Sequence, residues 1–425
     1  MRVLWVSMNA SLYDQALKRD NYGGGGWIFA LQQNIMRYAP WIELGITFLY
    51  PKERDKVKLN GVIYYPLKEM TYCGFAKLLY YWKDYKNEDL NVYLPKLQKI
   101  VDDFKPDVVH VWGVENLLGC ACLLKNVPVV AHLQGFLSLY RYTYYPYGMN
   151  NFTFKWKKFS IHEWIFNNGI IFGEHRMAKR AENEIQNLQS ISNVMGRTEW
   201  DKDVALYNNP NVNYFHVDEM LRKEFYIAKK WNKKREDKFV VFSTISETLY
   251  KGVDLILKTA ANMKEYGYFD FEWHVAGVFN SSEFTSFFEK HCHIKASDVN
   301  VKFLGSLCPD RLVYECQSAD LYVHPSYIDN SPNSLCEAQL LGLPIIATNV
   351  GGINSLVKNR VTGILVPPNA PVNMAMAIKD CHDNETYWKN MAEKGMIIAE
   401  KRHNPQKIIK DLLGVYNTIC NYDRK

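Results

Sequence analysis

Short apolar segments alternate with amphipathic ones along this chain, and the alternation starts twice. In the first half, apolar runs lie at 2–7, 43–50, 106–112 and 127–133, with helical patterns at 27–39 and 115–126. In the second half, apolar runs lie at 238–246, 271–278, 299–307, 321–326 and 343–349, with helical patterns at 251–267 and 281–293. This alternation predicts parallel β-sheets with helices on both faces, which is an α/β fold.

The chain length of 425 residues fits two such domains better than one. A charged run at 229–238 precedes the second start of the pattern. We therefore expect an N-terminal Rossmann-like domain at 1–215, a C-terminal Rossmann-like domain at 216–403 and a final helix at 404–425. Doubly wound domains bind ligands at the carboxyl ends of their strands, so we expect the two domains to face a central cleft.

Composition excludes several classes of protein. With 48% hydrophobic and 23% charged residues, the chain has an ordinary globular composition. A formal charge of +6 is too modest to indicate nucleic-acid binding. No segment approaches the ~20 apolar residues of a membrane span, and residues 2–7 read as a first strand, not as a signal peptide. Nine cysteines without a CxxC pair indicate a reducing, intracellular compartment and no metal site.

One stretch, residues 324–352, contains a strand, a polar loop, a helix, a buried strand and a Gly-Gly turn. Ser331 fits the N-cap of the helix, Pro332 its first position and Gly342 its end. The start of such a helix presents backbone N–H groups that favour a phosphate. The sequence therefore predicts an anion site at this helix start.

Two carboxylates complete the stretch, with Asp329 in the loop and Glu337 eight residues later in the helix. The stretch resembles the signature of the GT-B glycosyltransferases of family 4, in which two Glu residues flank seven others before a buried strand and a Gly-Gly turn. Here the first acid is Asp, which is one methylene shorter. The resemblance covers nearly the whole chain and is strongest in the second half. It implies a GT-B fold and a final helix, 404–425, that crosses back to the first domain.

The resemblance assigns roles to the donor site. Glu337 would bind the ribose hydroxyls of a nucleotide sugar, and Asp329 would contact the transferred sugar. The start of the helix would bind the diphosphate through Ser331, Asn333, Ser334 and Leu335. The alternative is that the stretch has only a structural role, as a capped amphipathic helix with one exposed acid.

Lys251 and Gly252 follow the strand at 238–246 and open a helix. A Lys at such a turn can place its ammonium on a diphosphate, although it can also be a solvated surface side chain. The resembled family has an Arg five residues earlier, where this chain has Ser246, which can donate a hydrogen bond but carries no charge. Either Lys251 acts alone or another base, such as Arg311 or Arg197, takes part.

The first domain offers two further groups. Four glycines at 23–26 follow the first strand, and we expect Gly24 and Gly25 to approach the donor or its diphosphate most closely. At the end of the strand at 127–133, Gln134 occupies the place of the family histidine that contacts the sugar. His132 lies on the same strand face and is either its substitute or a buried core histidine.

Three other patterns need an interpretation. Arg197 either faces an anion or holds the interdomain linker through Glu219. The Asp-Lys-Asp triplet at 201–203 is too short a pattern to indicate a metal–nucleotide motif. Residues 151–180 carry six basic and two acidic residues, a net charge of +4, interleaved with aromatics. This mixture fits an anionic membrane surface and a solvated helix equally well.

Together these features predict a retaining glycosyltransferase similar to family 4, which transfers a sugar from a nucleotide-sugar donor to a hydroxyl of a glycan or lipid-linked glycan. Lys251, Asp329, Gln134 and His132 would be the catalytic residues. We expect no cofactor and no metal, and a cytoplasmic location that includes peripheral contact with the inner membrane face. The alternatives are a sugar-nucleotide epimerase on the same fold and a non-catalytic sugar-nucleotide-binding protein.

Overall fold

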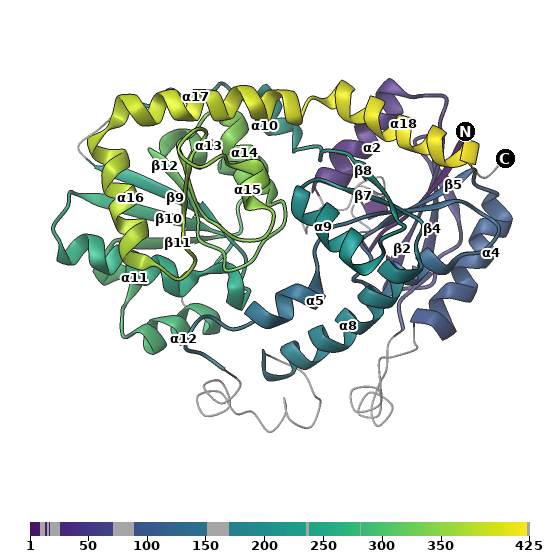
Figure 1. Ribbon diagram of the computed structural model, residues 1–425, viewed down its shortest axis with the longest axis horizontal. Coiled ribbons are helices and arrows are strands. Elements are labelled where there is room, and N and C mark those ends of the chain that lie inside the picture. The colour runs from purple at the N-terminus through teal and green to yellow at the C-terminus, as the bar shows by residue number, and fades with distance from the viewer. Residues whose placement is uncertain are drawn as a thin grey trace. The chain divides into compact units, whose positions relative to one another are not determined.

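The structure is a computed structural model that describes residues 1–8, 13–14, 17, 26–70, 89–150, 170–234, 238–280 and 282–422. The chain forms two compact units (Figure 1). Unit 1 contains Met1–Tyr142, Met149–Met220 and Pro405–Lys425, and unit 2 contains Thr143–Gly148 and Leu221–Asn404. The main boundary therefore lies between Met220 and Leu221, slightly later than the sequence placed it.

Unit 1 is built on an eight-stranded sheet in the order β3-β4-β2-β1-β5-β6-β7-β8. Its strands are β1 (Arg2–Val6), β2 (Glu43–Tyr50), β3 (Val57–Leu59), β4 (Val62–Lys68), β5 (Val108–Trp112), β6 (Val129–His132), β7 (Asn193–Gly196) and β8 (Asn213–His216). All neighbouring strands are parallel except β3 and β4, which pair antiparallel. β1 and β5 are buried along nearly their whole length, as expected for central strands covered on both faces.

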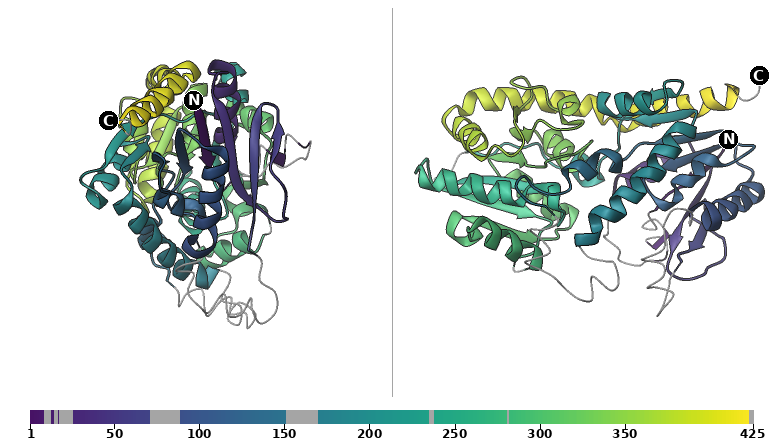
Figure 2. Two further views of the ribbon diagram at one scale, coloured as in Figure 1. Left: turned by 90° about the vertical axis from the view of Figure 1, so that its right-hand side faces the viewer. Right: turned by 60° about the horizontal axis from the view of Figure 1, so that its bottom comes forward.

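The α-helices of unit 1 connect these strands, and the chain returns to the unit at its end. They are α2 (Gly26–Tyr38), α4 (Leu94–Phe104), α5 (Leu137–Tyr140), α8 (Ile170–Ser190), α9 (Glu199–Asn208) and α18 (Pro405–Tyr422). α18 packs against α2 and β5, and both views in Figure 2 show it beside the N-terminal strand. The hydroxyl of Tyr416 on α18 accepts a hydrogen bond from Trp5 Nε1 at 3.1 Å and lies 2.6 Å from His110 Nδ1.

Unit 2 is built on a fully parallel six-stranded sheet in the order β11-β10-β9-β12-β13-β14. In chain order within the unit this is 3-2-1-4-5-6, the order of doubly wound nucleotide-binding folds. The strands are β9 (Phe239–Thr244), β10 (Phe271–Ala276), β11 (Val301–Gly305), β12 (Leu321–His324), β13 (Ile345–Thr348) and β14 (Ile364–Val366).

Helices connect the strands of unit 2, and α11 packs against α16 while α14 packs against α17. The α-helices are α10 (Lys223–Ile227), α11 (Val253–Glu265), α12 (Glu283–Cys292), α13 (Pro309–Ser318), α14 (Asn333–Leu341), α15 (Ile353–Leu356), α16 (Pro371–Asp383) and α17 (Glu385–Arg402). One core cluster joins Phe242, Tyr322 and Ala347 of the sheet to Leu312 and Leu335 of the helices. The residues of β12 and β13 and most of those of α14 are buried. The loops that join these elements therefore have both ends anchored in the core.

Two expectations for helices were wrong in detail. The pattern at 115–126 forms a 3₁₀ helix at Leu117–Leu123, in which a Cβ at Gly119 would lie only 2.4 Å from Val114 O. α14 begins at Asn333, and Pro332 is its N-cap in place of Ser331, because Pro332 has an extended backbone with ψ of 115°. In the described part of the chain, no helix combines the length and apolarity needed to cross a membrane.

Candidate functional site

Two predicted residues of the donor site, Lys251 and Asp329, meet at one edge of the sheet of unit 2. β9 and β12 are neighbours, and the strands that follow them lie on opposite sides of this pair. The carboxyl ends of such a pair form the switch point at which doubly wound sheets bind ligands. Lys251 follows β9, and Asp329 follows β12, so the fold brings together two residues that are far apart in the sequence.

Close backbone approaches fix the turn that carries Lys251. The turn is a 3₁₀ helix, Leu249–Lys251, and Gly252 follows it with a φ of +80°. A Cβ at Gly252 would lie 2.2 Å from the carbonyl oxygen of Pro325 in the loop after β12. Glycine is therefore required here by both backbone conformation and space. The backbone N–H of Tyr327 donates to Tyr250 O at 2.8 Å and ties the same two loops together.

Asp329 accepts hydrogen bonds from three side chains on one oxygen. Lys251 Nζ lies 2.6 Å from Asp329 Oδ2, His324 Nε2 lies 3.0 Å from it, and Ser326 Oγ lies 3.4 Å from it. Burial raises the pKa of Asp329, but the positive charge of Lys251 and the hydrogen bond from His324 outweigh burial and hold the pKa well below its usual range. Asp329 is therefore a carboxylate at neutral pH, with an ammonium in contact.

The start of α14 offers fewer donors than the sequence indicated. The amides of Leu335 and Cys336 donate to Pro332 O at 3.0 and 3.2 Å. The amides of Asn333 and Ser334 lie in the first turn, where the helix has no carbonyl one turn earlier to accept from them. They are therefore the donors at the tip of the helix. Leu335 itself is fully buried, so its side chain belongs to the core.

The Gly-Gly turn after β13 lies against the backbone of Asp329. Gly352 N donates to Asp329 O at 3.1 Å. Gly351 has a φ of +49°, and a Cβ at this position would lie 2.0 Å from Asp329 O. The signature glycines thus allow two loops to approach each other at the switch point.

Glu337 has a partner that the sequence did not indicate. Arg222 Nε donates to Glu337 Oε1 at 2.6 Å, and Arg222 Nη2 donates to Glu337 Oε2, so the pair is bidentate. The Glu337 side chain is 2% exposed and the Arg222 side chain 25% exposed. Arg222 lies 115 residues earlier in the chain, and no local pattern marks it as the partner.

Ser246 lies at the same edge but does not supply the charge that the family arginine would. Its side chain is exposed, and its hydroxyl lies 3.0 Å from that of Thr248. Arg311, one of the substitutes that the sequence offered, pairs with Glu315 at 2.7 Å on α13. Lys251 is therefore the cation that the structure places on Asp329.

The first-domain candidates lie in unit 1. Gly24 and Gly25 fall outside the described residues. Gln134 Nε2 donates to His132 O at 3.2 Å. His132 is 1% exposed, with its ring stacked on Trp112 at 5.0 Å and against Trp27 at 5.6 Å. Burial, with smaller effects of His110 and Arg197, holds the pKa of His132 well below its usual value, so the ring is neutral. His132 is therefore a buried histidine in this structure, and its role at the sugar stays a prediction.

Arg197 holds the end of unit 1 together. Its guanidinium pairs with Glu219 at 2.5 Å and donates to the carbonyl oxygens of Leu133 and Gln134 at 3.1 and 2.9 Å. Asp201 forms a capping box with Thr198 at the start of α9. The linker-holding alternative therefore describes Arg197, and the Asp-Lys-Asp triplet is part of a helix start.

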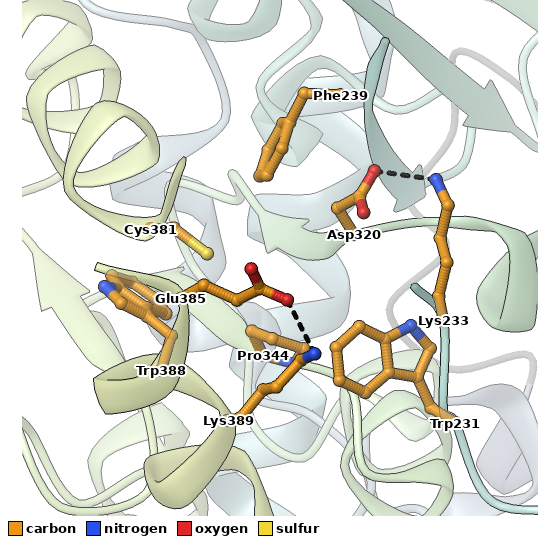
Figure 3. Close-up of a pocket in the computed structure, with 9 residues that line it drawn as sticks. All are labelled: Trp231, Lys233, Phe239, Asp320, Pro344, Cys381, Glu385, Trp388 and Lys389. Carbon is orange, nitrogen blue, oxygen red and sulfur yellow. Dashed lines mark hydrogen bonds and ion pairs between the residues drawn. The ribbon is translucent and has the colours of Figure 1, made fainter. Parts of the chain in front are cut away.

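A small hollow in unit 2 lies away from the donor residues. The aromatic rings of Trp231, Trp388 and Phe239 and the ion pairs Lys233–Asp320 and Glu385–Lys389 surround it (Figure 3). Phe239 and Asp320 mark the amino-terminal ends of β9 and β12, which is the opposite end of the strands from Lys251 and Asp329. Its volume of about 20 Å³ is room for about one water molecule.

The basic segment at 151–180 can be placed only in part. Of the basic residues at 151–180, Lys155, Lys157 and Lys158 lie outside the described residues. Within the part that is described, no group of three or more His, Cys, Asp or Glu side chains is arranged to hold a metal ion.

Solved structures share the whole architecture. A sucrose-phosphate synthase from Thermosynechococcus elongatus superimposes with a TM-score of 0.72 at 14% identity, covering 99% of both chains. The Anabaena protein HepE in complex with UDP-glucose superimposes with a TM-score of 0.63 at 14% identity, covering 98% of this chain and 100% of its own. The chain thus has the GT-B fold, with two Rossmann-like units.

Sequence comparison finds a family match within the second unit. Residues 225–397 match the family described as glycosyl transferases group 1. An uncharacterized glycosyltransferase of Methanocaldococcus jannaschii is 24% identical over 225 residues, which are 50% of this chain and 56% of that protein. A D-inositol 3-phosphate glycosyltransferase of Rhodococcus jostii is 40% identical over 79 residues, 19% of this chain and 18% of that protein. The chain spans about half the length of the first relative and less of the second.

Proposed function

We propose that this chain is a retaining glycosyltransferase that transfers a sugar from a nucleotide-sugar donor to a hydroxyl of a glycan or lipid-linked glycan. The observation that carries this proposal is the ammonium of Lys251, held 2.6 Å from Asp329 at the switch point of unit 2. A fixed cation near a helix start suits a diphosphate. The family match over unit 2 and the UDP-glucose complex of the Anabaena neighbour support a nucleotide sugar as the donor.

In the proposed reaction, the acceptor hydroxyl attacks the anomeric carbon on the face from which the diphosphate leaves. Negative charge then grows on the diphosphate oxygen as its bond to the sugar breaks. Lys251 and the amides of Asn333 and Ser334 stabilise this charge, and the leaving phosphate takes the proton of the acceptor. These groups can supply the charge stabilisation on their own, so we propose a reaction that requires neither a metal ion nor a protein nucleophile.

Glu337 is the proposed contact for the ribose of the donor. Arg222 donates to both oxygens of this buried carboxylate, and a carboxylate can accept several hydrogen bonds at once. Because Arg222 fixes both oxygens, Glu337 is oriented before the nucleotide binds. This role predicts that Glu337 contributes to the affinity for any nucleoside diphosphate of the correct class.

A thermal-shift screen against UDP-, GDP-, ADP- and CMP-sugars tests the donor site. We expect one nucleotide class to stabilise the protein, by about 2.7 kcal/mol at a hundred-fold excess over Kd, and Glu337→Gln to lose this stabilisation. Glu315→Gln is the matched control, because Glu315 is also buried and paired, with Arg311 at 2.7 Å and His274 at 3.0 Å. The proposal fails if no nucleotide sugar stabilises the wild-type protein, or if Glu337→Gln responds like the control.

Turnover separates transfer from the two alternatives. A transferase consumes the donor only when an acceptor is present, whereas an epimerase releases a new sugar from the donor alone, which mass spectrometry detects. Tight donor binding without turnover over a broad acceptor panel would favour a non-catalytic binding protein.

We also propose an intracellular location with peripheral contact between residues 151–180 and an anionic membrane, for which their net charge of +4 is the support. Co-sedimentation with anionic vesicles should weaken when Lys155, Lys157 and Lys158 are neutralised, and unchanged co-sedimentation would contradict this contact.

A further inference from the structure

We propose that Asp329 and His324 are positioning residues that fix the ammonium of Lys251 for the donor diphosphate, and that Asp329 does not contact the transferred sugar. This inference rests on the proposed function. It replaces the role that the family resemblance implies for Asp329.

The hydrogen bonds of the Asp329 carboxylate leave little capacity for a sugar hydroxyl. Oδ2 accepts from Lys251 at 2.6 Å, His324 at 3.0 Å and Ser326 at 3.4 Å, and Oδ1 accepts from the backbone N–H of Asn330 at 3.1 Å. Each carboxylate oxygen has about two acceptor positions, so Oδ2 is fully used and Oδ1 keeps about one. Asp329 is also only 7% exposed. The group is therefore arranged to hold protein side chains.

The backbone around Asp329 is fixed from two directions. On one side, Gly352 donates to Asp329 O, and the absence of a side chain at Gly351 allows that approach. On the other side, Tyr327 N donates to Tyr250 O at 2.8 Å, one residue before Lys251. The two loops therefore form a rigid frame, and the Lys251–Asp329 ion pair lies inside it.

His324 orients the carboxylate from a strand. It is the last residue of β12, and its side chain is 2% exposed. An imidazole on a buried strand has little freedom, so its contact with Oδ2 defines where that oxygen lies. His324 thus acts on Lys251 through Asp329.

Lys251 remains able to meet a ligand in this arrangement. Its side chain is 19% exposed, compared with 10% for that of Asp329. An ammonium has three donors, and Asp329 uses one of them. An ammonium held in place before the donor binds loses less entropy on binding a diphosphate than a free Lys would. The shorter side chain also fits this role, because an Asp reaches roughly 1.5 Å less far than a Glu and stays within the loop frame.

Binding measurements with and without the sugar distinguish the two roles of Asp329. Calorimetry compares UDP with UDP-glucose, or the equivalent pair of the class that the thermal screen selects, on wild-type protein and on Asp329→Asn. If Asp329 positions Lys251, the variant weakens both ligands by a similar factor, about ten-fold. If Asp329 contacts the sugar, the variant weakens UDP-glucose and leaves UDP unchanged, and the inference is overturned.

A double-mutant cycle tests the dependence on Lys251. We expect Lys251→Ala and Asp329→Asn to lower the affinity for the diphosphate individually, and the double variant to be no weaker than Lys251→Ala alone. Additive losses would show that Asp329 acts independently and would contradict the inference.

His324 provides a second pair of variants in case Asp329→Asn folds poorly. His324→Gln keeps an N–H donor at about the reach of Nε2, whereas His324→Leu removes it. We expect the Gln variant to retain diphosphate affinity and the Leu variant to lose about as much as Asp329→Asn, with the unfolding temperature of each recorded as a check. Equal affinity of the Leu variant and the wild type would overturn the role of His324. Failure of wild-type protein to bind any nucleoside diphosphate would instead refute the proposed function.

Discussion

At the scale of single residues, ion pairs in this protein differ in burial, and their contributions to stability should differ accordingly. Arg197 and Glu219 pair at 2.5 Å with side-chain exposures of 5% and 1%. Lys56 and Asp103 pair at 2.7 Å with exposures of 58% and 45%. Removal of one partner from a buried pair leaves an uncompensated charge and costs about 3–5 kcal/mol, whereas exposed pairs contribute about 0–1 kcal/mol.

We therefore expect Glu219→Gln to lower the free energy of unfolding of unit 1 by about 3 kcal/mol, because Arg197 stays buried without its partner. The control, Lys56→Met, should change it by less than about 1 kcal/mol. Urea unfolding followed by circular dichroism measures both. Similar losses in the two variants would contradict a special role for the buried pair.

The residues of the donor site differ in how far they can be predicted from the sequence. Lys251 and Asp329 were predictable because each follows a buried strand, and parallel strands bring their carboxyl ends to one edge. The direct contact between Lys251 and Asp329 was not predictable, because strand positions do not determine which side chains touch. Arg222 was missed because it meets Glu337 only through tertiary packing, and His324 because a polar residue at a strand end has no distinctive pattern.

At the scale of elements, a buried carboxyl group links two helices of unit 1. Glu184 on α8 accepts hydrogen bonds from Leu137 N at 2.6 Å and from Ser138 N and Oγ at the start of α5. Burial raises the pKa of Glu184 from its usual 4.5 to about 7, although the hydrogen bond from Ser138 opposes the shift. This link between α8 and α5 should therefore depend on pH.

The raised pKa determines the direction of that dependence. Below pH 4.5 the Glu184 carboxyl group is protonated in both the folded and the unfolded chain, and its contribution to stability is fully present. Between pH 4.5 and 7 the unfolded chain ionises first, so the free energy of unfolding falls by about 3 kcal/mol in total and then becomes constant. We expect Glu184→Gln to remove this dependence, while Glu199→Gln, at a 75% exposed side chain, keeps it. Urea unfolding between pH 4.5 and 8 measures the difference, and parallel profiles for wild type and Glu184→Gln would contradict it.

The elements themselves were predictable where burial gives a continuous apolar run. β9, β10, β12 and β13 are such strands, and the sequence located each of them. β7 and β8 have four residues each and include polar or exposed positions, so they lack that signal. The hairpin of β3 and β4 was also missed, although Asn60 and Gly61, with φ of +50° and +83°, are a typical two-residue hairpin turn.

At the scale of the whole molecule, unit 1 depends on segments from both ends of the chain. β1 is its first strand in the sequence, and α18, which follows unit 2 in the sequence, also belongs to unit 1. Ile408, Leu412 and Tyr416 of α18 are buried, and the Tyr416 hydroxyl meets Trp5 of β1 and His110 of β5. The final helix is therefore part of the core of unit 1, and its loss should expose the face that carries Trp5.

We expect a chain that ends at Asn404 to show faster hydrogen exchange in β1, β5 and α2 and unchanged exchange in β9 and β12, because the contacts of α18 described above, with α2 and β5, lie within unit 1. Exchange followed by mass spectrometry resolves these peptides separately. The matched point variant is Tyr416→Phe, which keeps the ring but leaves the Trp5 N–H without its partner, at a cost of about 1–3 kcal/mol. It should produce the same pattern more weakly. Faster exchange in β9 and β12, or no change in β1 and β5, would show that α18 does not stabilise unit 1 selectively.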